Sequence, residues 1–248
     1  MGLEALIFDV DGTLAETEEA HRRALNETFR AFDLPWEWDQ PTYRRLLRVM
    51  GGKERLRHFI EHDRPPQADR ALAALGELHA AKNRRYAELV HEGAVTLRPG
   101  VERLIHQARA AGVRLAIATT TSLGNVEALL STTLGADGPG LFETIAAGDS
   151  VAVKKPAPDI YLLALKRLAL DPSEAIAFED TVYGVRSAAA AGLRSVATPN
   201  FYTDDQDFSG AAAVFDSLGE ADRPARWLAG AGRGQTMVTV EFLRTLMD

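Results

Sequence analysis

Residues 3–13, LEALIFDVDGT, decide the fold: an apolar run rich in Ile, Phe and Val ends in two aspartates and a glycine. Such a run, closed by a turn signal, predicts a strand buried on both faces, as in a parallel sheet. Side chains alternate along a strand, so Asp9 and Asp11 leave it on the same side. We expect both carboxylates at the carboxyl end of this strand, facing the crevice where open α/β sheets bind ligands.

Further short apolar runs follow at 113–118, 144–147, 175–178 and 195–198, with a weaker one at 212–215. Helical spacing of apolar residues separates several of them, at 101–108, 156–170 and 182–189, and Gly112 and Gly192 provide stop signals. Alternating strands and helices predict an α/β fold, a Rossmann-like parallel sheet with helices on both faces.

Residues 17–92 interrupt this alternation because they contain only helical patterns. We interpret them as an all-helical cap domain inserted after the first strand. The α/β catalytic core then comprises residues 1–16 and 93–222. A C-terminal extension, 223–248, has no pattern that predicts its structure.

Composition excludes several classes of protein. The 248 residues carry 28 basic and 35 acidic side chains, a formal charge of −7, which disfavours nucleic acid binding. The absence of cysteine rules out disulfides and thiolate chemistry. Neither a membrane span nor a targeting segment is recognisable, so we expect a cytoplasmic protein with a small-molecule substrate and no nucleic acid, membrane or direct protein partner.

Polar residues at successive strand ends indicate one site. Two neighbouring carboxylates repel each other unless a cation such as Mg²⁺ lies between them. Beyond the aspartates of the first strand, the remaining residues follow later strands: Thr119, Thr120 and Thr121, then Lys155, then Glu179 and Asp180. Each piece alone is typical of a turn or a helix cap. Together, at the same edge of a parallel sheet, they indicate a catalytic site.

On these motifs the chain resembles the haloacid dehalogenase superfamily: DVDGT at 9–13, Thr119, Lys155, and the acidic pair Glu179 and Asp180. The cap position, KPAPD at 155–159 and FEDT at 178–181 resemble its phosphoglucomutase-like branch. The resemblance implies that Asp9 attacks a phosphoryl group and that Asp11 is the general acid and base. Lys155 and Thr119 would hold phosphoryl oxygens.

The same resemblance implies a Mg²⁺ site. Asp9 and Asp180 would contribute side chains to it, Asp11 would contribute its backbone carbonyl, and Glu179 would support them.

Substrate selection is expected from the cap and the facing loops. Glu18 and His21 are three residues apart on the first cap helix, so they share a face. The other candidates are the positive charges Arg44, Lys53 and Arg55, the glycines Gly51 and Gly52, and the loop residues Thr120 and Thr121. GGK at 51–53 is not a nucleotide-binding P-loop, since Leu47 and Glu54 stand where that motif requires Gly and Ser or Thr.

Further segments resemble the CbbY-type family of xylulose-1,5-bisphosphate phosphatases: AETEE at 15–19, GGKER at 51–55, ATTTS at 118–122, NVEAL at 125–129 and FYT at 201–203. The resemblance implies a sugar bisphosphate substrate that is an inhibitor of Rubisco. The cap cations would then bind the distal phosphate.

Three alternatives remain open at this stage. A β-phosphoglucomutase-like phosphotransferase, or a phosphatase for another sugar phosphate, would use the same core residues. A receiver-like signalling domain also combines Asp, Thr and Lys with Mg²⁺, but it is about half this length.

His58 and His62 have the spacing of helical zinc ligands without a third ligand, so we interpret them as surface residues. We interpret Trp36 and Trp38 as packing residues.

Overall fold

The computed structural model describes residues 2–247 and contains a seven-stranded sheet with the order β3-β2-β1-β4-β5-β6-β7. All neighbouring pairs are parallel except β6 and β7. The strands are β1 (Ala5–Phe8), β2 (Arg114–Ala118), β3 (Thr144–Ala146), β4 (Ala175–Glu179), β5 (Arg194–Ala197), β6 (Ala213–Phe215) and β7 (Trp227–Gly230). The predicted α/β fold is confirmed, and all six predicted strands are present.

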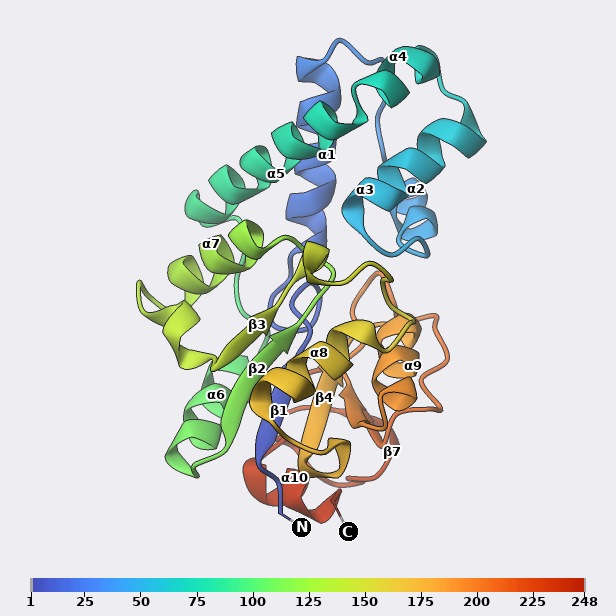
Figure 1. The fold of residues 1–248 in the computed structure, drawn as a ribbon. Helices are drawn as coiled ribbons and strands as arrows, with labels where there is room; N and C mark the ends of the chain where they lie inside the picture. Colours follow the sequence, from blue (N-terminus) through green and yellow to red (C-terminus); the bar gives the residue numbers. More distant parts are fainter. Residues whose placement is uncertain (1, 248) are drawn as a thin grey trace.

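Helices cover both faces of the sheet (Figure 1). On one face, α8 (Asp159–Leu168) packs on β2 and β3, and α9 (Val182–Ala190) packs on β4 and β5. The opposite side holds α6 (Val101–Ala110), which packs on β2, and α7 (Leu123–Thr133). Short 3₁₀ turns occur at Gly138–Leu141, Gly148–Ser150 and Pro172–Glu174.

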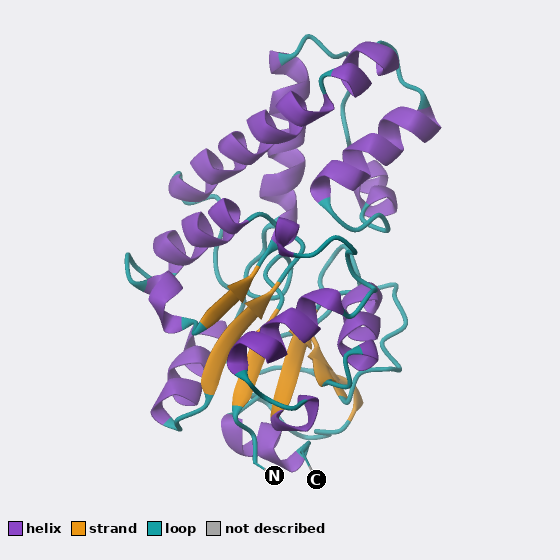
Figure 2. Cartoon of the chain, in the orientation of Figure 1, coloured by secondary structure: helices purple, strands orange, loops and turns teal. Residues whose placement is uncertain are grey.

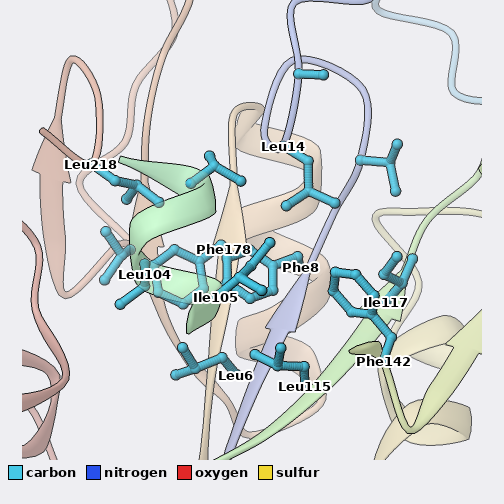
Figure 3. Packing of buried hydrophobic residues seen from close by; sticks show 14 of the residues in the cluster. Leu6, Phe8, Leu14, Leu104, Ile105, Leu115, Ile117, Phe142, Phe178 and Leu218 are labelled. Atoms are coloured by element: carbon cyan, nitrogen blue, oxygen red, sulfur yellow. The ribbon is translucent and has the colours of Figure 1, made fainter. Parts of the chain in front are cut away.

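Two buried layers sandwich the sheet because successive side chains of a strand point to opposite faces. Large side chains of β1, β2 and β4 face α6, where the rings of Phe8 and Phe178 stack 4.5 Å apart (Figure 3). Small residues of the same strands, including Ala116 and Ala177, face α8 and α9. The sheet is therefore buried on both sides, as its near-continuous apolar strands predict.

Residues 18–91 form five α-helices beyond the carboxyl ends of the strands, toward which the arrowheads point (Figure 2). They are α1 (Glu18–Ala31), α2 (Gln40–Leu46), α3 (Gly52–His58), continued by a π-helical turn at Phe59–Asp63, α4 (Ala68–Ala73) and α5 (Leu75–His91). We call this part the cap. It has an apolar cluster of its own, which includes Trp36 and Trp38, so these two residues pack as predicted.

The two linkers between cap and core run side by side. The backbone N–H of Glu16 donates to Thr96 at 3.2 Å, and that of Arg98 donates to Leu14 at 2.9 Å. The cap therefore joins the core through two adjacent segments. The domain boundaries proposed from the sequence, at residues 16, 92 and 222, stay predictions.

The C-terminal segment adds structure that the sequence did not predict. Strand β7 pairs antiparallel with β6, and α10 (Val240–Thr245) buries Val240, Phe242 and Leu243 in the core layer of α6. The tail thus extends the sheet and completes its core, at the end opposite the cap (Figure 1). Within residues 2–247, the helices are all too short or too polar to cross a membrane.

Candidate active site

Strand ends bring the predicted core residues to one place. Asp9 directly follows β1, Thr119 directly follows β2, and Glu179 and Asp180 end β4. The backbone N–H of Asp9 still donates to Phe178 of β4 at 3.0 Å, so sheet pairing fixes the position of this residue. All four side chains are buried. A parallel sheet therefore converts residues that are 170 positions apart into neighbours.

Lys155 lies between two carboxylates. Its Nζ is 2.7 Å from Asp9 Oδ1 and 2.6 Å from Glu179 Oε1, and the side chain is almost fully buried. Burial alone would lower the pKa of Lys155, but the two carboxylates raise it above its ordinary value. Tyr161 of α8 donates its hydroxyl to the same Glu179 oxygen at 2.5 Å. Lys155 is thus a fixed positive charge beside Asp9.

The acidic cluster fits a hard divalent cation. Asp9, Glu179 and Asp180 each offer a carboxylate oxygen, and these atoms lie within 4.8 Å of one another. Burial, together with the nearby charges of Glu179 and Asp11, raises the pKa of Asp9 to about 7 despite Lys155. Burial and the negative charges of Asp9 and Glu179 raise the pKa of Asp180 well above its ordinary value. Lys155 supplies one positive charge against three carboxyl groups, and Mg²⁺ would supply the remainder through the oxygen ligands it prefers.

Asp180 is held from two sides. Thr13 donates to Oδ1 at 3.3 Å, and Asn200, from the loop after β5, donates to Oδ2 at 2.7 Å. Gly12 lies so close that a Cβ there would be 2.2 Å from Asp180 Oδ2, and its φ of +75° also favours glycine. The glycine of the DVDGT motif therefore leaves room for the acid of β4.

Asp11 ends a chain of hydrogen bonds that starts in the cap. Lys82 of α5 can only donate, so its Nζ donates to His21 Nδ1 at 2.9 Å. The other ring nitrogen, Nε2, then donates to Asp11 Oδ1 at 2.9 Å. Burial alone would raise the pKa of Asp11, but His21 lowers it below its usual range. Burial and the positive charge of Lys82 lower the pKa of His21 to about 4, so the imidazole is neutral.

A cavity between cap and core contains most of the predicted site. It is lined by the core residues Asp9, Asp11, Thr119, Thr120, Thr121, Lys155, Glu179 and Asp180, and by the cap residues Glu18, His21, Gly51, Gly52, Arg55 and Lys82. Glu18 accepts a hydrogen bond from Tyr43 at 2.7 Å, and burial raises its pKa to about 6. The guanidinium of Arg55 lies 5.6 Å from the centre of the same tyrosine ring.

Two predicted cap residues lie outside this cavity. Lys53 is exposed and lines an adjoining cavity that it shares with Gly52, Thr120 and Thr121. Arg44 pairs with Asp204 at 2.9 Å across the cap–core boundary. The substrate-binding roles of both residues stay predictions.

Sequence reasoning missed Lys82, Tyr161 and Asn200. Lys82 had a usable signal, because it lies four residues from both Leu78 and Tyr86 on the buried face of α5, where a charge needs a partner. Tyr161 and Asn200 had none, since only the tertiary fold brings them to the acidic residues.

The histidines of the π-helical turn are not part of this site. The rings of His58 and His62 stack 4.0 Å apart on the surface, and His62 Nδ1 bonds to the His58 carbonyl. Among residues 2–247, Asp9, Glu179 and Asp180 form the one acidic or histidine group arranged to hold a metal ion.

Comparison with known proteins gives the class. Residues 3–192 match the model of the haloacid dehalogenase-like hydrolase family. The chain therefore belongs to the haloacid dehalogenase-like hydrolases, which excludes the receiver-like alternative.

Individual relatives show which type within this hydrolase family the chain is similar to. The chain is 51% identical over 218 residues to protein CbbY of Cereibacter sphaeroides, covering 88% of this chain and 94% of that protein. The crystal structure of CbbY from Rhodobacter sphaeroides with phosphate has 50% identity and a TM-score of 0.81, covering 87% of this chain and 94% of that one. The crystal structure of a CbbY mutant from the same organism with xylulose-(1,5)bisphosphate has 49% identity and a TM-score of 0.82. That match covers 89% of this chain and 98% of the mutant chain. The predicted CbbY-type membership is confirmed, and the protein is a phosphoric monoester hydrolase.

Proposed function

We propose that this chain is a Mg²⁺-dependent sugar bisphosphate phosphatase that uses an aspartyl phosphate and acts on xylulose 1,5-bisphosphate, so removing an inhibitor of Rubisco. One observation carries the proposal: a buried Asp9 is paired with Lys155 at 2.7 Å in a cavity roofed by the cap. The complex of a CbbY relative, 49% identical, with xylulose-(1,5)bisphosphate supports the choice of substrate.

The nucleophile is a carboxylate oxygen of Asp9. It attacks phosphorus, the P–O bond to the sugar breaks, and water later attacks the phosphoryl group on Asp9 to release phosphate. Thr119 directly follows β2 and Lys155 lies in the loop before α8; both line the cavity of Asp9, where they can bind the phosphoryl oxygens as negative charge develops. Mg²⁺, held by Asp9, the Asp11 carbonyl and Asp180 with Glu179 in support, would neutralise the remaining phosphoryl charge when bound.

Asp11 is the general acid and base of the proposed reaction. In the structure it is an ionised acceptor of the His21 hydrogen bond, the form needed to take a proton from the attacking water. To protonate the leaving sugar oxygen it must first gain a proton. Lys82 is the end of the hydrogen-bonded chain that holds one, and burial lowers its pKa to about 8. Asp11 is thus ready to act as base in the second step, and its role as acid in the first step requires protonation against its lowered pKa.

Cations of the cap suit a substrate that carries a second phosphate. Arg55 brings a positive charge into the same cavity as Asp9, and Lys53 brings another to the adjoining cavity. A sugar with a phosphate at each end can place one at Asp9 and the other near these cations. A monophosphate would use only one of the two charged regions.

The direct test is phosphate release from xylulose 1,5-bisphosphate, with ribulose 1,5-bisphosphate and β-glucose 1-phosphate as comparison substrates, in Mg²⁺ and in EDTA. We expect metal-dependent release that is fastest with the first substrate. Conversion of β-glucose 1-phosphate to the 6-phosphate without phosphate release would instead establish the phosphotransferase. Release only from other sugars would retain the chemistry and refute the substrate.

A further inference from the structure

Asn200 connects the acidic cluster to a short loop that follows β5. Its side chain is buried, and Nδ2 lies 2.7 Å from Asp180 Oδ2. The orientation of the amide follows from its other partner: the backbone N–H of Tyr202 can only donate, so the atom 2.8 Å from it is Oδ1. Nδ2 is therefore the atom that faces the carboxylate. A third bond, from the Asn200 N–H to Thr203 Oγ1 at 3.0 Å, fixes the backbone.

The same loop reaches into the cap. Tyr202, two residues further on, is a core residue by sequence, yet its ring is buried in the apolar cluster of the cap, 5.5 Å from that of Tyr43. Its hydroxyl donates to Glu19 of α1. Asp204 adds the ion pair with Arg44 of α2. Residues 200–204 thus contact Asp180 at one end and two cap helices at the other.

We propose that Asn200 is a positioning residue that orients Asp180 for the divalent cation, and that the 200–204 loop links the position of the cap to this acid. The inference rests on the proposed function, which supplies the Mg²⁺. Among residues 2–247, the hydrogen bonds to the Asp180 side chain come from Thr13 and Asn200 and not from a lysine or arginine, so a neutral amide donor can align one oxygen without cancelling the charge that a cation needs. Hydrogen-bond partners of metal ligands have this effect in other metal sites.

The test is calorimetric titration of the full chain with MgCl₂, which needs no turnover. Asn200→Ser is the informative variant, because a serine hydroxyl can still accept from the Tyr202 N–H but is too short to reach Asp180. We expect its dissociation constant for Mg²⁺ to rise about tenfold. Tyr202→Phe keeps the ring in the cap and removes the hydroxyl that donates to Glu19, so we expect a smaller rise.

Asn26→Ala is the matched control, since the Asn26 side chain is also buried and also makes two hydrogen bonds, both with the backbone of Trp38 in the cap. It should bind Mg²⁺ like the unmodified chain. Unchanged affinity in Asn200→Ser would overturn the positioning role, and unchanged affinity in Tyr202→Phe would overturn the link to the cap. If the unmodified chain itself binds no Mg²⁺, the metal-dependent function fails first and the inference fails with it.

Discussion

Asp9 and Asp11 are two residues apart, yet their surroundings separate their chemistry. Burial and neighbouring carboxylates raise the pKa of Asp9 to about 7, whereas the His21 hydrogen bond keeps that of Asp11 below its usual range. In paired acids the raised pKa ordinarily belongs to the general acid and the ionised group is the nucleophile, so the roles proposed here require a cation beside Asp9 and a proton on Asp11. Asp9 needs a cation to become a carboxylate at neutral pH, and Lys155 provides only one of the charges required.

The first prediction concerns the nucleophile. Asp9→Asn should abolish phosphate release, because an amide cannot replace the attacking carboxylate oxygen. The fold should persist, since asparagine has almost the same shape. Phosphate release and circular dichroism would be measured together, with Asp63→Asn in the cap as a control of unchanged activity. Turnover by the Asp9 variant, even at a tenth of the normal rate, would contradict the mechanism.

A second residue-scale prediction concerns Lys53. Lys53→Ala should reduce kcat/KM for a sugar bisphosphate more than for a monophosphate, because only the former has a distal phosphate to bind. Steady-state kinetics on both substrates would measure the difference. Lys166→Ala, which removes an exposed lysine from α8, is the control for general charge effects. Equal losses of kcat/KM on the two substrates would show that Lys53 does not bind the distal phosphate.

At the scale of elements, the first turn of α9 is built around the Glu179 carboxylate. A Cβ at Gly184 would lie 1.8 Å from Glu179 Oε2, so only glycine fits there. Thr181 caps the helix by accepting a hydrogen bond from the Gly184 N–H at 3.0 Å. The end of β4 and the start of α9 therefore pack as one unit, which holds the Glu179 carboxylate against Lys155 Nζ.

Gly184→Ala should consequently displace Glu179. We expect the free energy of unfolding to fall by about 1–3 kcal/mol and phosphatase activity to fall with it. Urea denaturation and phosphate release would measure the two effects. The control is Gly76→Ala in α5, where a Cβ would meet nothing within 4 Å, so helix propensity should raise stability by up to about 1 kcal/mol. Normal stability of Gly184→Ala would show that Glu179 can move without cost.

At the scale of the whole molecule, one buried arginine joins segments far apart in the chain. Arg98, in the second linker, donates to the carbonyls of Thr198 at 2.5 Å, Pro199 at 2.9 Å and Asp216 at 2.9 Å, and also to Gly12 of the catalytic loop. The loops after β1, β5 and β6 thus share one donor. The same residue pairs its backbone with the first linker, so the catalytic loop and the base of the cap have a common anchor.

Arg98→Ala should therefore destabilise the protein strongly. Four carbonyls would lose their donor, and we expect a loss of roughly 3–5 kcal/mol in the free energy of unfolding. Chemical denaturation would measure it. Arg109→Ala, an exposed position on α6, should change stability by less than about 0.5 kcal/mol. A similar small effect at both positions would mean that water replaces the Arg98 bonds.

The sequence by itself predicted six of the seven strands, because short apolar runs such as 3–10, closed by turn residues and separated by helical patterns, indicate strands buried between two layers of helices. It also located Asp9, Asp11 and Thr119, since a residue just after a strand lies at one edge of a parallel sheet, and it located Lys155 in the loop that leads from the third strand to the next helix. Local patterns of this kind need no knowledge of distant contacts.

Only the tertiary structure decided the remainder. Strand β7 and helix α10 have weak local patterns and form because they pack against β6 and α6. Asn200 reaches Asp180, and Tyr202 enters the cap, through contacts between segments that are 20 or more residues apart. No periodicity records such contacts, because they depend on how the elements pack and on which buried polar groups then need partners.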